Sequence, residues 1–163
     1  MIRVGILTMS DKASRGERED LSGKVIEEMV ARIEGRVDVY RILPDERKEI
    51  ERALIELADS QELDLILTTG GTGLAARDVT PEATRSVIDR DVPGFGELIR
   101  ARSFEITPAG ILSRMTAGIR SRTLIINLPG SPKAVRECLE WIMPSIPHAV
   151  ELLRGDVGDH ERP

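Results

Sequence analysis

The stretch that decides the fold is Leu65-Ile66-Leu67-Thr68-Thr69-Gly70-Gly71-Thr72-Gly73-Leu74-Ala75-Ala76-Arg77-Asp78. Its first five residues are typical of a buried β-strand, and the glycines that follow predict a tight loop with few side chains. In open α/β sheets, ligands bind at loops that follow the C-terminal ends of strands. We therefore expect a ligand site at this loop.

The composition of the loop favours a phosphate ligand. Glycine allows positive φ and lets backbone N–H groups face an anion. Arg77 adds a forked donor, and Asp78 offers hard oxygen ligands for magnesium. The same residues also fit a plain exit from a strand, with Asp78 as a turn former. The spacing matches neither a P-loop nor a dinucleotide-binding fingerprint, which argues against a P-loop kinase and an NAD enzyme.

The composition of the whole chain limits its partners. With 163 residues it is long enough for one domain with a full core, and its net charge of -5 and few aromatic residues argue against nucleic acid. The single cysteine, Cys138, lies in an apolar helical pattern and is expected in the core. The chain starts with a strand-like run and has no apolar stretch that could span a membrane, so a cytoplasmic location is expected.

Short β-rich runs alternate with amphipathic runs, which predicts an α/β domain with helices on both faces of a mostly parallel sheet. Strands are expected at 4–9, 37–42, 63–69, 115–121 and 123–128, and helices at 21–34, 50–58, from 80, 93–104, from 132 and up to 153. The strands at 115–121 and 123–128 are separated by little more than a turn, so one antiparallel pair and a mixed sheet are expected. The domain is predicted to cover 1–155, followed by a charged tail at 156–163.

Several residues predict where helices begin and end. Gly35 is expected to stop the first long helix, and Gly155 the last one. Thr80 and Ser131 are expected as N-caps, each followed by a proline at the first helical position.

Four strand ends deliver polar loops that are expected to meet at one edge of the sheet: Ser10-Asp11, Pro44-Asp45, Gly70–Asp78 and Pro129-Gly130-Ser131. Two carboxylates, a glycine loop and a helix N-terminus suit phosphoryl or nucleotidyl transfer, in which the protein positions groups and neutralises charge. Each residue also has a structural alternative: Asp45 as an N-cap, Asp11 in a turn, Ser131 as a cap, and Glu82 interacting with a helix dipole.

A set of motifs makes the chain similar to a known family. They are Thr68-Thr69-Gly70-Gly71-Thr72-Gly73, Arg77-Asp78-Val79-Thr80-Pro81-Glu82-Ala83-Thr84, Val92-Pro93-Gly94-Phe95-Gly96-Glu97, Ile111-Leu112-Ser113-Arg114 and Asn127-Leu128-Pro129-Gly130-Ser131-Pro132-Lys133. In this order they resemble the molybdenum cofactor biosynthesis family of the Mog/MoaB type. Ser10-Asp11-Lys12-Ala13-Ser14 and Leu43-Pro44-Asp45-Glu46 resemble the Mog branch, the molybdopterin adenylyltransferases.

The resemblance implies a three-layer α/β/α domain, commonly a homotrimer, that uses MgATP to adenylylate molybdopterin and releases pyrophosphate. It implies that Asp45 and Asp78 are the catalytic acids and hold Mg²⁺. It further implies contacts to ATP or molybdopterin from these residues: Ser10, Asp11, Thr69, Gly70, Gly71, Thr72, Gly73, Arg77, Thr80, Glu82, Pro129, Gly130 and Ser131. The resemblance also implies other molybdenum cofactor assembly proteins as partners.

The chain departs from the Mog-type enzymes at two positions of the glycine loop. These enzymes often have proline where this chain has Leu74, and a second basic residue where it has Ala76.

Two alternatives to the adenylyltransferase stay open. The chain could be a non-catalytic molybdopterin-binding assembly protein of the MoaB type, although the Leu-Pro-Asp-Glu acid together with the Arg-Asp pair favours the enzyme. It could also be a nucleotide hydrolase on the same domain, as in competence-damage-type proteins.

Overall fold

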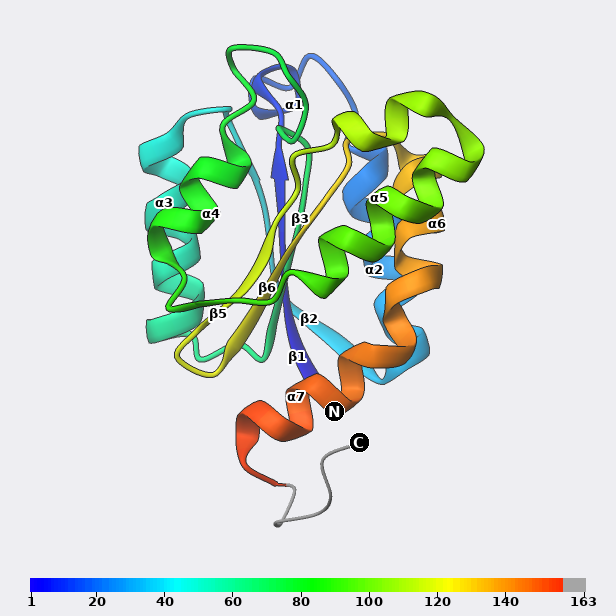
Figure 1. Ribbon diagram of the computed structural model, residues 1–163. Helices are drawn as coiled ribbons and strands as arrows, with labels where there is room; N and C mark the ends of the chain where they lie inside the picture. Colours follow the sequence, from blue (N-terminus) through cyan, green and yellow to red (C-terminus); the bar gives the residue numbers. More distant parts are fainter. Residues whose placement is uncertain (157–163) are drawn as a thin grey trace.

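A six-stranded mixed sheet forms the centre of the molecule in the computed structural model, which describes residues 1–156 (Figure 1). Its strands are β1 (Ile2–Met9), β2 (Gly35–Leu43), β3 (Leu65–Thr69), β4 (Arg90–Asp91), β5 (Ala117–Arg120) and β6 (Thr123–Leu128), in the order β2-β1-β3-β6-β5-β4. The first four in this order run parallel, whereas β5 is antiparallel to both neighbours. The predicted mixed sheet is confirmed. β4 was not predicted, because two exposed charged residues carry no strand pattern.

Helices cover both faces of this sheet. The α-helices of the described residues are α1 (Asp11–Ser14), α2 (Leu21–Val30), α3 (Arg47–Ile55), α4 (Thr80–Val87), α5 (Gly94–Ile106), α6 (Pro132–Ile142) and α7 (Ile146–Arg154). Figure 1 shows α3 and α4 on one face, and α2, α5 and α6 on the other. The predicted three-layer arrangement in a single domain is therefore confirmed.

The core is divided in two by the sheet, because side chains alternate along each strand. Ile6 of β1 belongs to the larger cluster, under α2, α6 and α7, whereas its neighbour Leu7 packs with α3 and α4. On β3, Leu67 and Ile66 divide in the same way. Cys138 of α6 is 2% exposed, and burial raises the pKa of its thiol to about 12, so its predicted place in the core is confirmed.

Two predicted helix ends can be compared with the structure. Gly155, with φ of 79°, caps α7 as expected. The prediction for Gly35 was wrong: α2 ends at Val30, and the 3₁₀ turn that follows it, Ala31–Ile33, is capped by Glu34, which adopts the left-handed conformation with φ of 56°. Gly35 is the first residue of β2, and a Cβ there would lie 2.7 Å from the carbonyl oxygen of Val30. Glycine is needed at position 35 for close packing against Val30 and not for the turn.

A charged C-terminal tail was predicted at residues 156–163. Most of it, residues 157–163, lies outside the described residues. Within residues 1–156, no helix combines the length and the apolar character needed to cross a lipid bilayer.

An ion pair at the end of the sheet opposite to the β3 loop joins α7 to the entry of β3. Asp64 accepts hydrogen bonds from Nε and Nη2 of Arg154 at 2.9 and 2.6 Å, and from the backbone N–H of Arg3 at 2.7 Å. Burial by itself raises the pKa of Asp64, but these hydrogen bonds outweigh it, and the pKa lies below its ordinary value of 3.8. Since the folded-state pKa is lowered, this stabilisation is present above pH 3.8 and is lost as the pH falls through the folded-state pKa.

We therefore expect Asp64→Asn to lower the free energy of unfolding at pH 7 by about 1–3 kcal/mol, with a smaller difference from wild type below pH 3.8. Urea unfolding at both pH values measures this. Glu28→Gln serves as the surface control, since Glu28 is 66% exposed in its pair with Arg136 and is expected to change stability by less than about 0.5 kcal/mol. A difference for Asp64→Asn that does not change with pH would contradict the prediction.

Candidate active site

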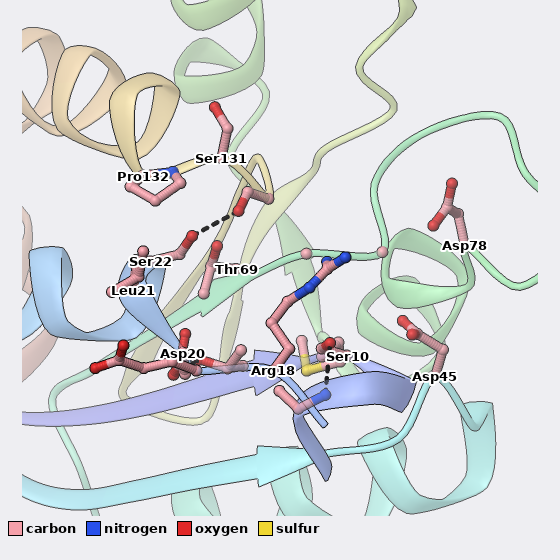
Figure 2. Close-up of a pocket in the computed structure, with 17 residues that line it drawn as sticks. Ser10, Arg18, Asp20, Leu21, Ser22, Asp45, Thr69, Asp78, Ser131 and Pro132 are labelled. Atoms are coloured by element: carbon pink, nitrogen blue, oxygen red, sulfur yellow. Dashed lines mark hydrogen bonds between the residues drawn. The ribbon is translucent and has the colours of Figure 1, made fainter. Parts of the chain in front are cut away.

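A pocket of about 670 Å³ lies at the C-terminal ends of the parallel strands (Figure 2). Its lining residues are Thr8, Met9, Ser10, Ala13, Arg18, Glu19, Asp20, Leu21, Ser22, Asp45, Thr69, Gly70, Gly71, Asp78, Gly130, Ser131 and Pro132. Each of the four loops that were expected to meet contributes at least one of them. The expected convergence of the four strand ends is therefore observed.

Asp45 is a partly buried acid of this pocket. Its Oδ2 accepts a hydrogen bond from the N–H of Asp11 at 3.1 Å, and its own N–H donates to Oδ1 of Asp11 at 3.0 Å. Its Oδ1 is buried and, within residues 1–156, has no hydrogen-bond partner. Burial raises the pKa of Asp45, and the carboxylates of Asp11 and Asp78 add to this rise. A carboxylate with an unpaired buried oxygen is suited to a cationic ligand.

This arrangement also corrects the structural alternative for Asp45. The residue at the N-cap position of α3 is Glu46, and no side chain caps this helix. Asp45 instead joins its loop to the loop after β1 through the two reciprocal hydrogen bonds with Asp11.

The glycine loop after β3 adopts the expected positive φ at only two of its three glycines, Gly70 at 91° and Gly71 at 69°. Gly73 has no positive φ, but a Cβ there would lie 2.8 Å from Oδ2 of Asp78. The loop was predicted to turn its backbone N–H groups toward an anion. For Gly70 this prediction was wrong, because its N–H donates to the carbonyl of Leu128 at 3.3 Å. Among the described residues, the N–H of Gly71 has no acceptor.

Replacing Gly71 by alanine is expected to destabilise the fold for two reasons. The residue would adopt a left-handed conformation, which costs about 1–2 kcal/mol for a residue with a Cβ. The Cβ would also clash with the hydroxyl of Thr80 and lie 3.1 Å from Oδ1 of Asp45. Gly16 offers a matched control, because it has φ of 74° and a Cβ added there would meet no atom within 4 Å.

We expect Gly71→Ala to lower the free energy of unfolding by at least about 1 kcal/mol more than Gly16→Ala. Urea unfolding of the two variants measures the difference. Equal losses would show that the contact with Thr80 and Asp45 is not tight.

Arg114 fixes the second half of the glycine loop. Its Nε donates to the carbonyl of Gly73 at 2.8 Å, its Nη2 to the carbonyl of Asp78 at 2.7 Å, and its Nη1 to both carboxylate oxygens of Glu82 at 2.9 and 2.7 Å. Its backbone N–H donates to the carbonyl of Thr72 at 2.9 Å. The hydrogen bonds from Arg114 lower the pKa of Glu82. Glu82 is therefore the partner of a residue that holds the loop.

The Asp78 side chain closes the turn at the end of this loop. Its Oδ2 accepts a hydrogen bond from the N–H of Ala75 at 3.0 Å, and Asp78 also lines the pocket. The turn therefore forms with Leu74 and Ala76 in place, and Leu74 is 65% exposed.

Arg77 lies outside the pocket and is bound by acids. Its Nε and Nη2 donate to Oδ2 and Oδ1 of Asp11 at 3.1 and 2.9 Å, and its Nη2 lies 2.9 Å from Oε1 of Glu46. The forked donor that was expected to face a phosphate therefore joins three loops. The same hydrogen bonds lower the pKa of Asp11.

Hydroxyl groups hold the loop after β6. Thr69 donates to the carbonyl of Pro129 at 2.6 Å, and Ser22 donates to that of Gly130 at 2.5 Å. The side chain of Ser131 accepts from the N–H of Ala134 at 3.2 Å, so its role as N-cap of α6 is confirmed.

For Thr80 the cap prediction was wrong. It is the first residue of α4, and its hydroxyl donates to the carbonyl of Gly70 at 2.9 Å.

The predicted site residues divide into two groups. Those that line the pocket are Ser10, Asp45, Thr69, Gly70, Gly71, Asp78, Gly130 and Ser131, and those that do not are Asp11, Thr72, Gly73, Arg77, Thr80, Glu82 and Pro129. Residues 18–22 also line the pocket and were not predicted to do so. The N-cap of α2, Asp20, was the available signal, because a capped helix that follows the loop after β1 begins at the same edge of the sheet.

Both oxygens of the Asp20 carboxylate accept hydrogen bonds. Its Oδ1 accepts from the N–H of Gly23 at 2.9 Å, and its Oδ2 accepts from the hydroxyls of Thr8 at 2.7 Å and of Tyr40. Burial and the nearby Asp20 carboxylate raise the pKa of Tyr40. These contacts fix the start of α2 in the pocket wall.

Within residues 1–156, no group of three or more His, Cys, Asp or Glu side chains is placed to hold a metal ion. Asp45 and Asp78 are two carboxylates that lie on the same side of the pocket in Figure 2. A divalent cation bound there would take further oxygen ligands from a phosphate ligand or from water.

Comparisons with known proteins agree with this geometry. A family model described as a probable molybdopterin binding domain matches residues 5–148. The chain is 51% identical over 157 residues to the molybdopterin adenylyltransferase of Helicobacter pylori strain J99, covering 95% of this chain and 89% of that protein. It is 42% identical over 168 residues to the molybdopterin adenylyltransferase of Escherichia coli K12, covering 94% and 86%.

Solved structures of molybdenum and tungsten cofactor biosynthesis proteins are also similar to this chain. The molybdopterin biosynthesis enzyme MoaB of Thermus thermophilus has a TM-score of 0.90 and 54% identity, over 95% of this chain and 98% of that one. The tungsten cofactor synthesizing protein MoaB of Pyrococcus furiosus has a TM-score of 0.85 and 39% identity, over 94% and 97%. The chain therefore belongs to the Mog/MoaB family of molybdenum cofactor biosynthesis proteins.

Proposed function

We propose that this protein is a molybdopterin adenylyltransferase that transfers AMP from ATP to the terminal phosphate of molybdopterin. An oxygen of that phosphate forms a bond to the α-phosphorus of ATP, the bond from the α-phosphorus to the bridging oxygen breaks, and pyrophosphate leaves with the electron pair. Relatives that are 42–51% identical over nearly the whole chain carry this name. The observation that carries the proposal is the pocket in which Asp45, Asp78 and the glycine loop come together.

We propose that Asp45 and Asp78 hold Mg²⁺ on the triphosphate. The unpaired buried oxygen of Asp45 supports this, since magnesium prefers carboxylate oxygens and would supply the missing partner. The bound ion would neutralise charge on the phosphates. Asp11 would orient Asp45 through the reciprocal hydrogen bonds between their loops.

The remaining predicted site residues are proposed to act in two ways. Ser10, Thr69, Gly70, Gly71, Gly130 and Ser131 would contact ATP or molybdopterin, supported by their place in the pocket wall. Thr72, Gly73, Arg77, Thr80, Glu82 and Pro129 would shape the pocket from outside, supported by their hydrogen bonds to the loops that line it.

We also propose that the protein works as a homotrimer in the cytoplasm and meets other molybdenum cofactor assembly proteins there. Large apolar side chains that are exposed around α5 support an assembly: Leu98, Phe104, Ile106, Ile111 and Leu112. Light scattering of the purified protein gives the number of copies directly, and a monomer would contradict this part of the proposal.

A non-catalytic molybdopterin-binding protein is the second candidate, because the Thermus thermophilus structure with 54% identity is named MoaB. Incubation of the purified protein with molybdopterin, Mg²⁺ and α-labelled ATP separates the two candidates. We expect label in a pterin product, and its loss in Asp78→Asn. Binding of molybdopterin without any labelled product would instead favour the non-catalytic protein, and release of labelled nucleotide without pterin would favour a hydrolase.

A further inference from the structure

The charges in the pocket wall are unevenly distributed. Four acids line it, namely Glu19, Asp20, Asp45 and Asp78, whereas Arg18 is the one lysine or arginine among its described lining residues. ATP and molybdopterin both carry phosphate groups, which such a wall would repel. A phosphate ligand therefore needs positive charge inside the pocket, and magnesium at Asp45 and Asp78 would supply it at one end only.

The guanidinium of Arg18 is available for a ligand. Within residues 1–156, no carboxylate lies within ion-pair distance of it and no hydrogen bond engages it. Arg18 lines the pocket together with Thr69, Asp45 and Asp78, and in the view of Figure 2 its guanidinium is drawn between Thr69 and the two acids. Other arginines of the region are engaged, because Arg77 binds Asp11 and Arg114 binds Glu82.

The two acids that follow Arg18 in the chain do not compete for it. Glu19 pairs with Lys24 at 2.6 Å. Asp20 accepts hydrogen bonds from Gly23, Thr8 and Tyr40. Arg18 is thus an exposed cation that reaches into an acidic pocket although acids stand next to it in the sequence.

We propose that Arg18 binds a phosphate group of one of the two substrates, in the place that the sequence had given to Arg77. This proposal rests on the proposed transfer between ATP and molybdopterin. A forked guanidinium can donate two parallel hydrogen bonds to a phosphate, which a lysine cannot do. The shared chemistry is a phosphate ester, and the source is either the triphosphate of ATP or the terminal phosphate of molybdopterin.

The test is a set of titrations of the full chain by calorimetry. Wild type, Arg18→Gln, Arg18→Lys and Arg36→Gln are each titrated with ATP in the presence of Mg²⁺ and, separately, with molybdopterin. Arg36 is a matched control because it loses the same charge, is 59% exposed in a pair with Asp38, and follows the first residue of β2, at the end of the sheet opposite to the pocket. Adenosine is titrated as well, because it lacks phosphate.

Loss of one charged, forked contact is expected to raise the Kd of Arg18→Gln by about 10- to 100-fold for one of the two phosphate ligands, and the ligand affected identifies the source. Arg18→Lys is expected to lie between wild type and Arg18→Gln, whereas Arg36→Gln and the adenosine titrations are expected to stay unchanged. Kd values of Arg18→Gln within about twofold of wild type for both ligands would overturn the proposal.

These outcomes are distinguishable from a failure of the proposed function. If wild type binds both ligands and forms no product, the transfer reaction is wrong, and the effect of Arg18→Gln on binding still tests Arg18. If wild type forms product and Arg18→Gln binds normally, the transfer reaction stands and Arg18 has no part in it. Arg18 makes no contact that the fold needs, so an unchanged midpoint of thermal unfolding is expected for its variants.

Discussion

Asp45→Asn is expected to lower the rate of adenylyl transfer by about 100- to 1000-fold, while the free energy of unfolding at pH 7 stays equal to that of wild type or rises. The rate falls because an amide is a weaker magnesium ligand than a carboxylate. Stability is retained because the amide oxygen can still accept the hydrogen bond from Asp11, and because the folded-state pKa of Asp45 is raised. An ionised group with a raised folded-state pKa destabilises the fold above that pKa, and Asn removes this effect.

The measurement combines the rate of label transfer from α-labelled ATP with urea unfolding at pH 7. Glu46→Gln is the matched control, since it removes the same charge from the next residue, which is 53% exposed and does not line the pocket. It is expected to keep the wild-type rate. If Asp45→Asn lost stability together with activity, the reciprocal contact with Asp11 would be the reason for the acid, and its proposed role toward magnesium would be contradicted.

Arg114→Lys is the second variant with a large expected effect. Lysine cannot reach Gly73, Asp78 and Glu82 at once, so the second half of the glycine loop loses its common anchor. We expect a loss of about 1–3 kcal/mol in the free energy of unfolding. We also expect a fall of about 100-fold in the rate of transfer, because displacement of Asp78 by an ångström changes the geometry of the site.

Hydrogen exchange of residues 73–78 separates this positioning role from general destabilisation. Arg100→Lys is the matched control, since Arg100 donates to the carbonyls of Ser113 and Met115 next to Arg114 without touching the glycine loop. It is expected to lose stability with little change in exchange at 73–78 or in rate. Equal exchange at 73–78 in both variants would show that Arg114 does not position the loop.

Much of the fold could be predicted from the sequence because its signals are local. The β-rich run from Leu65 to Thr69 with a following glycine turn, and the spacing of Val135, Leu139 and Ile142, identify β3 and α6 without any knowledge of their neighbours. The order of strands and helices then places four loops at one edge of the sheet. Asp45, Gly71, Asp78 and Ser131 could be brought to one pocket on that basis alone.

The tertiary structure decided which partner each polar group has. Gly70 and Arg77 were expected to face a phosphate, yet Gly70 donates to Leu128, and Arg77 binds Asp11, which lies 66 positions away in the chain. Gly35 was expected to end the helix, yet Glu34 adopts the left-handed conformation there, and Gly35 instead lies where a Cβ would come 2.7 Å from the carbonyl oxygen of Val30.

The physical reason is the range over which each effect acts. Hydrophobic periodicity, capping and glycine conformations depend on residues within a few positions of each other, so the sequence by itself determined the layers, the sheet and the edge that carries the site. Hydrogen bonds and charge pairs depend on which groups meet after folding. Only the tertiary structure could therefore show that Asp45 keeps an unpaired buried oxygen, that Arg114 anchors the glycine loop, and that Arg18 reaches into the pocket without a partner among the described residues.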